Sequence, residues 1–157
     1  MNNDHTQRFS FLVHHVARLH GAHFDRLARQ RLGLSLAQCR LIGALARHEG
    51  PDPLSQAELA QRLELSAMGV GALCDRMEAA GWIRREAAAG DRRVKWVHPE
   101  PRALAAFEEA LRLSDEVQAH GLATLSAAER RQLVALLRKA RAGLMAWEPA
   151  AAGDRTP

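Results

Sequence analysis

The sequence predicts a mainly α-helical protein with one small β-hairpin, and three observations support this. The chain of 157 residues is 47% hydrophobic but only 4% aromatic, and its apolar residues are mostly leucine and alanine. This composition favours helices over strands. Four serines precede helical patterns in the manner of helix caps. One short region with β-branched and aromatic residues interrupts the helical pattern, as a hairpin does.

The first four helices follow from the positions of the caps. Ser35 and Ser55 are each followed three residues later by Gln or Glu, which completes a capping box. Ser66 caps a helix without such a partner, and Gly81 ends that helix as a left-handed glycine. The expected helices cover about 8–31, 35–48, 56–62 and 66–80.

The helical pattern stops after Gly81 and resumes at Pro101. Between them, residues 82–86 and 93–98 read as two strands, joined by the small, polar segment AAAGD. Two long amphipathic helices follow, over about 101–121 and 127–147, and the second starts at a further capping box.

A short helix pair followed by a hairpin is the order of elements of a winged helix-turn-helix. The predicted fold is therefore mainly α, a winged helix-turn-helix with a small β-hairpin wing, flanked by N- and C-terminal dimerisation helices. The expected divisions are an N-terminal dimerisation helix, a DNA-binding domain, C-terminal dimerisation helices and a disordered tail, at 1–34, 35–100, 101–147 and 148–157.

The hairpin and the helix before it are the candidate DNA-binding surface. Five positive side chains against two negative ones lie in residues 84–95, and the tip between the strands is small enough for a narrow groove. A plain helical hairpin and a solvated basic hairpin are the alternatives to this interpretation. The candidate DNA-binding residues are Ser55, Ser66, Ala67, Met68, Gly69, Gly71, Ala72, Arg76, Arg84, Asp91, Arg92, Arg93 and Lys95.

Two glycines within one turn of the fourth predicted helix need a reason, because each costs about 1 kcal/mol relative to alanine. Gly69 and Gly71 fall on phases opposite Val70 and Leu73, so we expect them to face outward. The hypothesis is that they let the helix backbone approach DNA closely.

The segment LSQAELAQRLELSAMGVGALCDRMEAAGWIRREAAAGDRRVKWVHP resembles the winged helix of MarR-type transcriptional regulators. The resemblance extends over roughly 10–147, and its most specific motif is Gly90-Asp91-Arg92-Arg93. It implies a homodimer that reads a pseudo-palindromic operator, with Asp91 holding Arg93 or the wing backbone and Arg93 reaching the minor groove. It also implies repression and release by a small aromatic or anionic effector. The chain departs from the pattern at His98-Pro-Glu-Pro101, where the family usually has Leu-Thr.

Apolar stripes on the first and the last two helices independently favour a dimer, with packing on the chain's own core as the alternative. They comprise Leu12, Val16, Leu19, His23, Leu27, Leu104, Phe107, Leu111, Val117, Leu133, Leu136, Leu137, Leu144 and Met145. Near the junction of the first helix with the winged helix, the candidate effector-binding residues are His14, His15, Arg18 and His20.

Charge and composition limit the other functions. The net charge of +4 and the pI of about 10.0 are compatible with a nucleic-acid partner. Cys39 and Cys74 are expected to be small buried hydrophobes, and the histidines have no matching metal partners, so no metal site is expected. No phosphate loop or nucleophile elbow is present, so neither enzymatic activity nor a cofactor is expected.

No signal peptide or membrane span is apparent either, which predicts a cytoplasmic location. The remaining alternatives are a winged helix used for protein contacts and a redox- or metal-responsive member of the same family.

Overall fold

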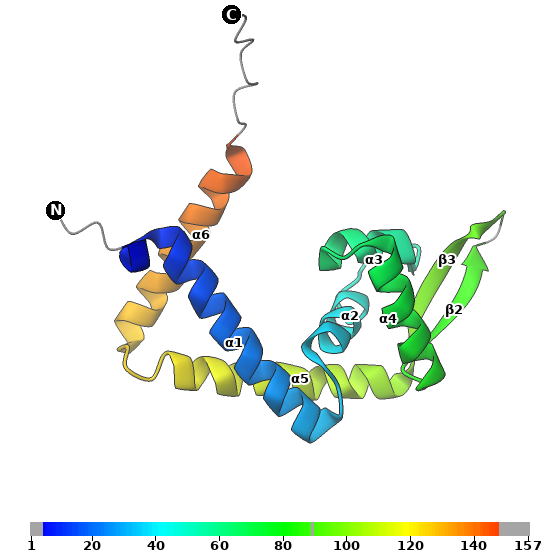
Figure 1. Ribbon diagram of the computed structural model, residues 1–157, viewed down its shortest axis with the longest axis horizontal. Coiled ribbons are helices and arrows are strands. Elements are labelled where there is room, and N and C mark those ends of the chain that lie inside the picture. Colours follow the sequence, from blue (N-terminus) through cyan, green and yellow to red (C-terminus); the bar gives the residue numbers. More distant parts are fainter. Residues whose placement is uncertain (1–4, 89, 148–157) are drawn as a thin grey trace, which may run out of the picture. The chain divides into compact units, whose positions relative to one another are not determined.

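The computed structural model describes residues 5–88 and 90–147, in which seven helical segments and three short strands follow one another (Figure 1). The helical segments are η1 (His5–Gln7), α1 (Phe9–Leu32), α2 (Leu36–Ala46), α3 (Gln56–Leu63), α4 (Ala67–Ala79), α5 (Pro101–Gly121) and α6 (Ala127–Ala146). The strands are β1 (Leu54–Ser55), β2 (Ile83–Ala88) and β3 (Asp91–Pro99). The predicted disordered tail, 148–157, lies outside the described residues.

All four predicted serine caps are confirmed. The hydroxyl oxygens of Ser35, Ser55 and Ser126 each accept the backbone N–H three residues later, and the Gln or Glu side chain at that position accepts from the serine N–H. Ser66 Oγ accepts the N–H of Gly69 at 3.0 Å with no reciprocal acid. The predicted ends are less accurate, since α2 stops at Ala46, two residues early.

The sheet is antiparallel with strand order β1-β3-β2, and its edge strand β1 was not predicted. Leu54 pairs with Val97 and Ser55 with Trp96, while Arg85 of β2 also pairs with Val97 from the other side. The hairpin is longer than expected, because β2 continues to Ala88 and β3 starts at Asp91, with an irregular register near the tip. Gly90 there has φ +97°, a conformation that side chains rarely adopt.

Residues up to Gln118 and residues from Ala119 onward form two compact units. Within the first unit, the winged helix shares one hydrophobic core with parts of α1 and α5. Its buried members are Phe24, Ala28, Leu34, Cys39, Leu41, Ile42, Leu45, Leu54, Leu59, Val70, Leu73, Cys74, Met77, Ile83, Val97, Ala103, Ala106, Ala110, Leu113 and Val117. The predicted division at 34/35 and 100/101 stays a prediction, but it passes through this continuous core. In the second unit, α6 has no buried residue.

Candidate nucleic-acid interface

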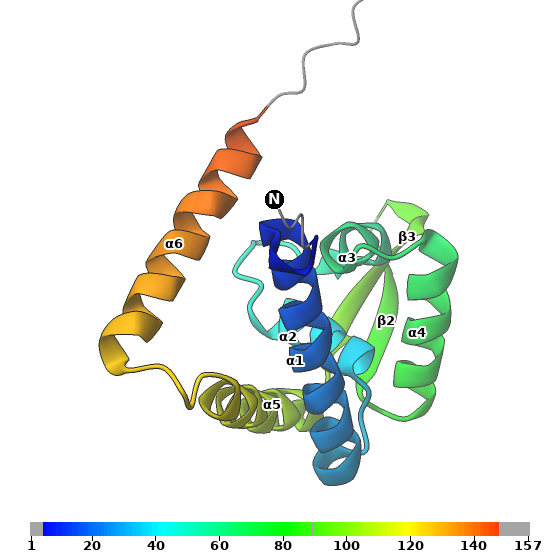
Figure 2. The same cartoon turned by 60° about the vertical axis from the view of Figure 1, so that its left-hand side comes forward.

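Helices α3 and α4 form the helix-turn-helix, and Figure 2 shows them beside the hairpin. The connection turns at Glu64, a non-glycine residue with φ +55°. Helical spacing predicts six inward-facing residues: Leu59, Leu63, Leu65, Val70, Leu73 and Met77. Of these, Leu59, Val70, Leu73 and Met77 are buried, and Leu63 is half-buried against the core. Leu65 is a correction, because it is 39% exposed and lies at the end of the turn rather than inside the pair.

One face of α4 is exposed along the whole helix. The exposed residues recur at helical spacing, and they are Ala67, Met68, Ala72, Asp75, Arg76 and Ala79. Most of these side chains are short, so the backbone of this face lies close to its surface, and Met68, at 85% exposure, is the most exposed apolar side chain on it. Five of the six are non-acidic, which suits a surface that approaches phosphates.

The two glycines flank this exposed face rather than lie in the middle of it, which corrects the expectation that they face outward. Both are half-buried. A Cβ at Gly69 would lie 3.2 Å from Ser66 Oγ, the oxygen that caps the helix, and a Cβ at Gly71 would lie 3.9 Å from Gln56 Nε2. Gly69 therefore leaves room for the cap, and Gly71 lies beside α3.

Replacing Gly71 by alanine is expected to raise the free energy of unfolding by up to about 1 kcal/mol, because the methyl group meets only ordinary contacts while the helix gains propensity. The increase for Gly69→Ala is expected to be smaller, since the Ser66 hydroxyl must move. Urea denaturation of both variants measures this order. If Gly71→Ala also loses affinity for DNA, the hypothesis that Gly71 lets the α4 backbone approach DNA closely is supported. Unchanged affinity excludes that hypothesis.

The base of the wing is fastened to α4 by Arg85. Its guanidinium donates to Glu78 Oε2 from Nε at 3.0 Å and from Nη2 at 2.7 Å, and its backbone N–H donates to Glu78 Oε1 at 2.7 Å. Nη2 also lies 2.8 Å from Asp75 Oδ1, and Nη1 donates to Gln56 Oε1 at 3.3 Å. These bonds hold the pKa of the Glu78 carboxyl below its usual value. Arg85 therefore joins the wing to both helices, and its guanidinium is engaged within the chain.

The tip of the wing has the predicted pairing of Asp91 with Arg93. Asp91 Oδ1 accepts the Arg93 backbone N–H at 3.0 Å and Nε at 3.1 Å, and Oδ2 accepts Nη2 at 3.1 Å. Hydrogen bonding from Arg93 lowers the pKa of the Asp91 carboxyl. The Arg93 side chain remains 91% exposed, so it is oriented by Asp91 but still accessible.

The other candidate DNA-binding residues differ in their exposure and in their contacts. Lys95 is exposed, whereas Arg84 contacts Glu86 at 3.1 Å and lies 3.8 Å from Glu100. Ser55 is 8% exposed and its hydroxyl donates to Glu58 Oε2 at 2.7 Å, so it serves the cap of α3. Arg92 belongs to β3, but its side chain is outside the described part of the structure.

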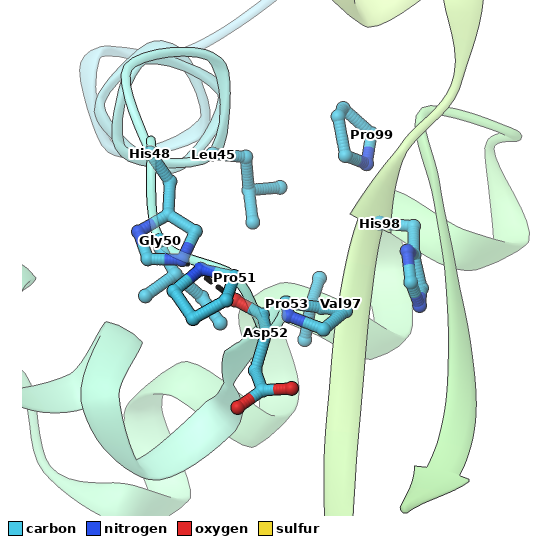
Figure 3. Close-up of a pocket in the computed structure, with 10 residues that line it drawn as sticks. Leu45, His48, Gly50, Pro51, Asp52, Pro53, Val97, His98 and Pro99 are labelled. Atoms are coloured by element: carbon cyan, nitrogen blue, oxygen red, sulfur yellow. Dashed lines mark hydrogen bonds between the residues drawn. The ribbon is translucent and has the colours of Figure 1, made fainter.

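The four candidate effector residues lie on α1, where His14 and Arg18 are exposed and His15 and His20 are half-buried. None of them lines the pocket of about 230 Å³ between the loop after α2 and strand β3 (Figure 3). The lining residues are Leu45, His48, Gly50, Pro51, Asp52, Pro53, Leu54, Val97, His98 and Pro99.

Both imidazoles of this pocket already have partners. His48 Nε2 lies 2.8 Å from the Asp52 carbonyl oxygen, and Nδ1 lies 3.4 Å from Arg62 Nη2. His98 Nε2 lies 2.8 Å from Glu86 Oε1. These contacts fix the loop and the wing, and they leave little polar capacity for a ligand.

The cysteines are buried, as predicted, with Cys39 7% exposed and Cys74 fully buried. Burial raises the pKa of the Cys39 thiol to about 11 and also raises that of Cys74. Among the described residues, no group of three potential metal ligands is present. None of the described helices is long and apolar enough to cross a membrane.

Both thiols are expected to react slowly with a chromogenic disulfide reagent in the folded protein at about pH 8, and quickly in urea, because only the thiolate attacks. Since the folded pKa of Cys39 is raised to about 11, the stabilisation from its neutral thiol is complete below the unfolded pKa of 9.0 and is lost as the pH rises toward 11. Rapid reaction of one thiol in the native protein would instead indicate a redox-responsive site.

A tight helix pair braced by a three-stranded sheet, with a basic hairpin tip beside an exposed helix face, defines the class of winged helix-turn-helix proteins. A model of the MarR family matches residues 32–94. The matched segment contains α2, α3, α4, β1, β2 and the start of β3, so the winged helix of this chain is similar to that of MarR-family proteins.

Solved structures show the same fold over nearly the whole chain. MepR of Staphylococcus aureus in complex with DNA is 24% identical, with a TM-score of 0.72 over 87% of this chain and 98% of MepR. Wild-type MarR from E. coli is 20% identical, with a TM-score of 0.76 over 85% and 96% of the two chains. Rv2887 of Mycobacterium tuberculosis, in complex with salicylic acid, is 23% identical, with a TM-score of 0.68 over 88% and 98%. No curated protein matches the chain by sequence.

Proposed function

We propose that this protein is a homodimeric, sequence-specific regulator that binds double-stranded DNA. The observation that carries the proposal is the joint exposure of the α4 face and of Arg93 at the wing tip, on two elements that Arg85 holds together. Helix α4 is of a size that enters the major groove, and the wing tip fits the adjacent minor groove. MepR has been solved on DNA with the same fold, which supports this arrangement.

The exposed face of α4 offers few side chains that could make direct contacts with base edges. Of its described side chains, Met68 suits contact with thymine methyl groups and Arg76 suits a guanine edge or a phosphate. The alanines offer only apolar contact. Groove shape and phosphate contacts from Arg93 and Lys95 therefore supply much of the affinity, and such contacts make binding fall steeply with salt.

The dimer is supported by apolar side chains that the fold leaves in solvent on α1, α5 and α6. The most exposed of them are Phe9, Val16, Leu104, Leu136, Leu144 and Met145, together with Trp147, the C-cap of α6, each between 45% and 77% exposed. Large apolar side chains exposed on helices in this way support an interface with a second copy of the chain. A two-fold dimer would place two α4 helices in successive major grooves about 34 Å apart, which matches a pseudo-palindromic operator.

The proposed regulation is repression by occluding the polymerase, reversed by a small aromatic or anionic effector. A complex of Rv2887 with salicylic acid supports an effector of this chemistry, and His14, His15, Arg18 and His20 are the proposed contacts. The proposed location is the cytoplasm, where the operator is. This part of the proposal rests on the relatives and on position along α1.

The test is binding of the purified protein to DNA from its own promoter region at several salt concentrations. We expect a specific complex whose affinity falls by orders of magnitude between about 50 and 200 mM salt. The absence of any specific complex at low salt would contradict the proposal and favour a winged helix that contacts only proteins. Sequencing genomic fragments selected by the protein would then identify the operator.

A further inference from the structure

The junction between the wing and α5 contains an arginine that the DNA interface does not use. The chain departs here from the usual family sequence, with His98-Pro-Glu-Pro101 in place of Leu-Thr, and Arg102 follows directly. Arg102 is exposed, and its guanidinium contacts the end of α4, with no acidic partner among the residues that the structure describes. Its position therefore indicates a role within the winged helix.

Arg102 makes two contacts with the residues that terminate α4. Its Cζ lies 3.7 Å from the centre of the Trp82 ring, and its Nη1 donates to the carbonyl oxygen of Ala80 at 2.9 Å. Ala80 is the C-cap of α4, and Gly81 follows with φ +71°. A Cβ at Gly81 would lie 3.9 Å from Arg102 Nη1, so the guanidinium covers the helix end closely.

Backbone hydrogen bonds also connect these residues, and we call the contacts of Ala80, Gly81, Trp82, Glu100 and Arg102 the α4–α5 joint. The N–H of Trp82 donates to the Met77 carbonyl at 2.8 Å, and the N–H of Glu100 donates to the Trp82 carbonyl at 2.9 Å. Trp82 is half-buried and packs against the hydrophobic core. The last turn of α4, the ring of Trp82 and the first turn of α5 are thus held in one arrangement.

Each contact favours an arginine at this position. A cation at a helix C-terminus complements the partial negative charge of the last carbonyl groups, and an aromatic face attracts a planar cation. The rigid guanidinium makes both contacts at once, which a lysine ammonium on a flexible stem does less well. These contacts therefore constrain the angle between α4 and α5 as well as stabilising the C-terminal end of α4.

The consequence lies along α5. This helix continues without a break from Pro101 to Gly121 and carries the exposed apolar residues Leu104 and Leu111. In the dimer proposed above, the angle between α4 and α5 sets how far apart and how rotated the two α4 helices are. We propose that Arg102, stacked on Trp82, is a positioning residue that sets which half-site spacing the dimer accepts. This inference rests on the proposed function.

The experiment uses the full-length protein and a duplex that it selects from random duplexes of about three helical turns. The spacer between half-sites is then lengthened or shortened by one base pair, which rotates one half-site by about a tenth of a turn. We expect the wild type to lose at least about tenfold in affinity on either change, and Arg102→Ala to lose less than about threefold. Trp82→Leu is expected to relax the spacing preference in the same way.

Two further variants separate positioning from simple stability. Arg102→Lys keeps the cation near the helix end, so it is expected to keep the wild-type midpoint of urea denaturation but to lose part of the spacing preference. Arg112→Ala removes an exposed arginine of α5 whose described ion pair is with Glu109, so it should keep the wild-type spacing preference.

The outcomes distinguish this inference from the proposed function. If the wild type selects no DNA, the proposed function fails and the joint has nothing to position. If the wild type binds with a marked spacing preference and folded Arg102→Ala retains that preference in full, the positioning role is overturned while the proposed function stands.

Discussion

Replacing Arg93 by alanine is expected to weaken binding to every duplex by about tenfold per wing, and so by about a hundredfold in a dimer. The variant removes a 91% exposed cation that Asp91 holds in one orientation. Because phosphates and groove potential carry little sequence information, preference among sequences should change little. The slope of log K against log salt should become shallower by about 1 for each phosphate that Arg93 neutralises in the wild type. Titrations of selected and scrambled duplexes at several salt concentrations measure both quantities.

The control for this variant is Arg29→Ala, which removes another exposed arginine that is paired with an aspartate, Asp25 on α1. It should leave affinity near the wild-type value. Another outcome for Arg93→Ala would contradict its role as a contact to phosphates and the groove. If the variant lost its preference at a single base position, Arg93 would contact a base edge directly. Unchanged affinity for all duplexes would remove the wing from the interface.

Replacing Val16 by aspartate is expected to convert the protein to a monomer and to lower its affinity for DNA by more than about a hundredfold, because each half-site then binds alone. Val16 is 63% exposed within the chain, so the substitution costs the isolated fold little. Burying a carboxylate in an apolar interface, by contrast, is strongly unfavourable. Sedimentation velocity and DNA titration on the same sample measure the two effects.

Ala22→Asp provides the control, since Ala22 is also exposed on α1 but belongs to a different face of the helix. It should remain dimeric and bind DNA normally. A Val16→Asp protein that sediments as the wild type does would show that this part of α1 lies outside the interface, and the apolar residues of α6 would then have to form it.

Helix starts were predictable because capping is local. Ser55 and Glu58 specify their helix through groups three residues apart, whatever the rest of the chain does. The Asp91–Arg93 contact at the wing tip also joins residues close in sequence, but it was the resemblance to MarR-type regulators that implied it. The end of α2 was predicted less well because it depends on contacts that are not local. The loop at 47–53 is held in place by contacts such as that of Arg62 with His48, which the local sequence does not indicate.

Contacts between distant segments were harder to predict. Strand β1 has two residues, and its partner Val97 lies far along the chain, so no local pattern indicates it. The sequence places Arg85 among the wing cations, whereas the structure ties it to Glu78 and Gln56. A signal for this was present, since alternation along β2 puts residue 85 on the same side as the buried Ile83.

The exposed face of α4 has a consequence for how such a protein changes over evolutionary time. Met68, Ala72 and Arg76 project from a helix whose buried side is fully occupied, and whose position is fixed by residues elsewhere. Substitutions at these three positions therefore cost little folding energy. Under the proposed function, a duplicated copy of the gene is then free to change its operator by substitutions at these sites, while selection for stability acts on a separate set of residues.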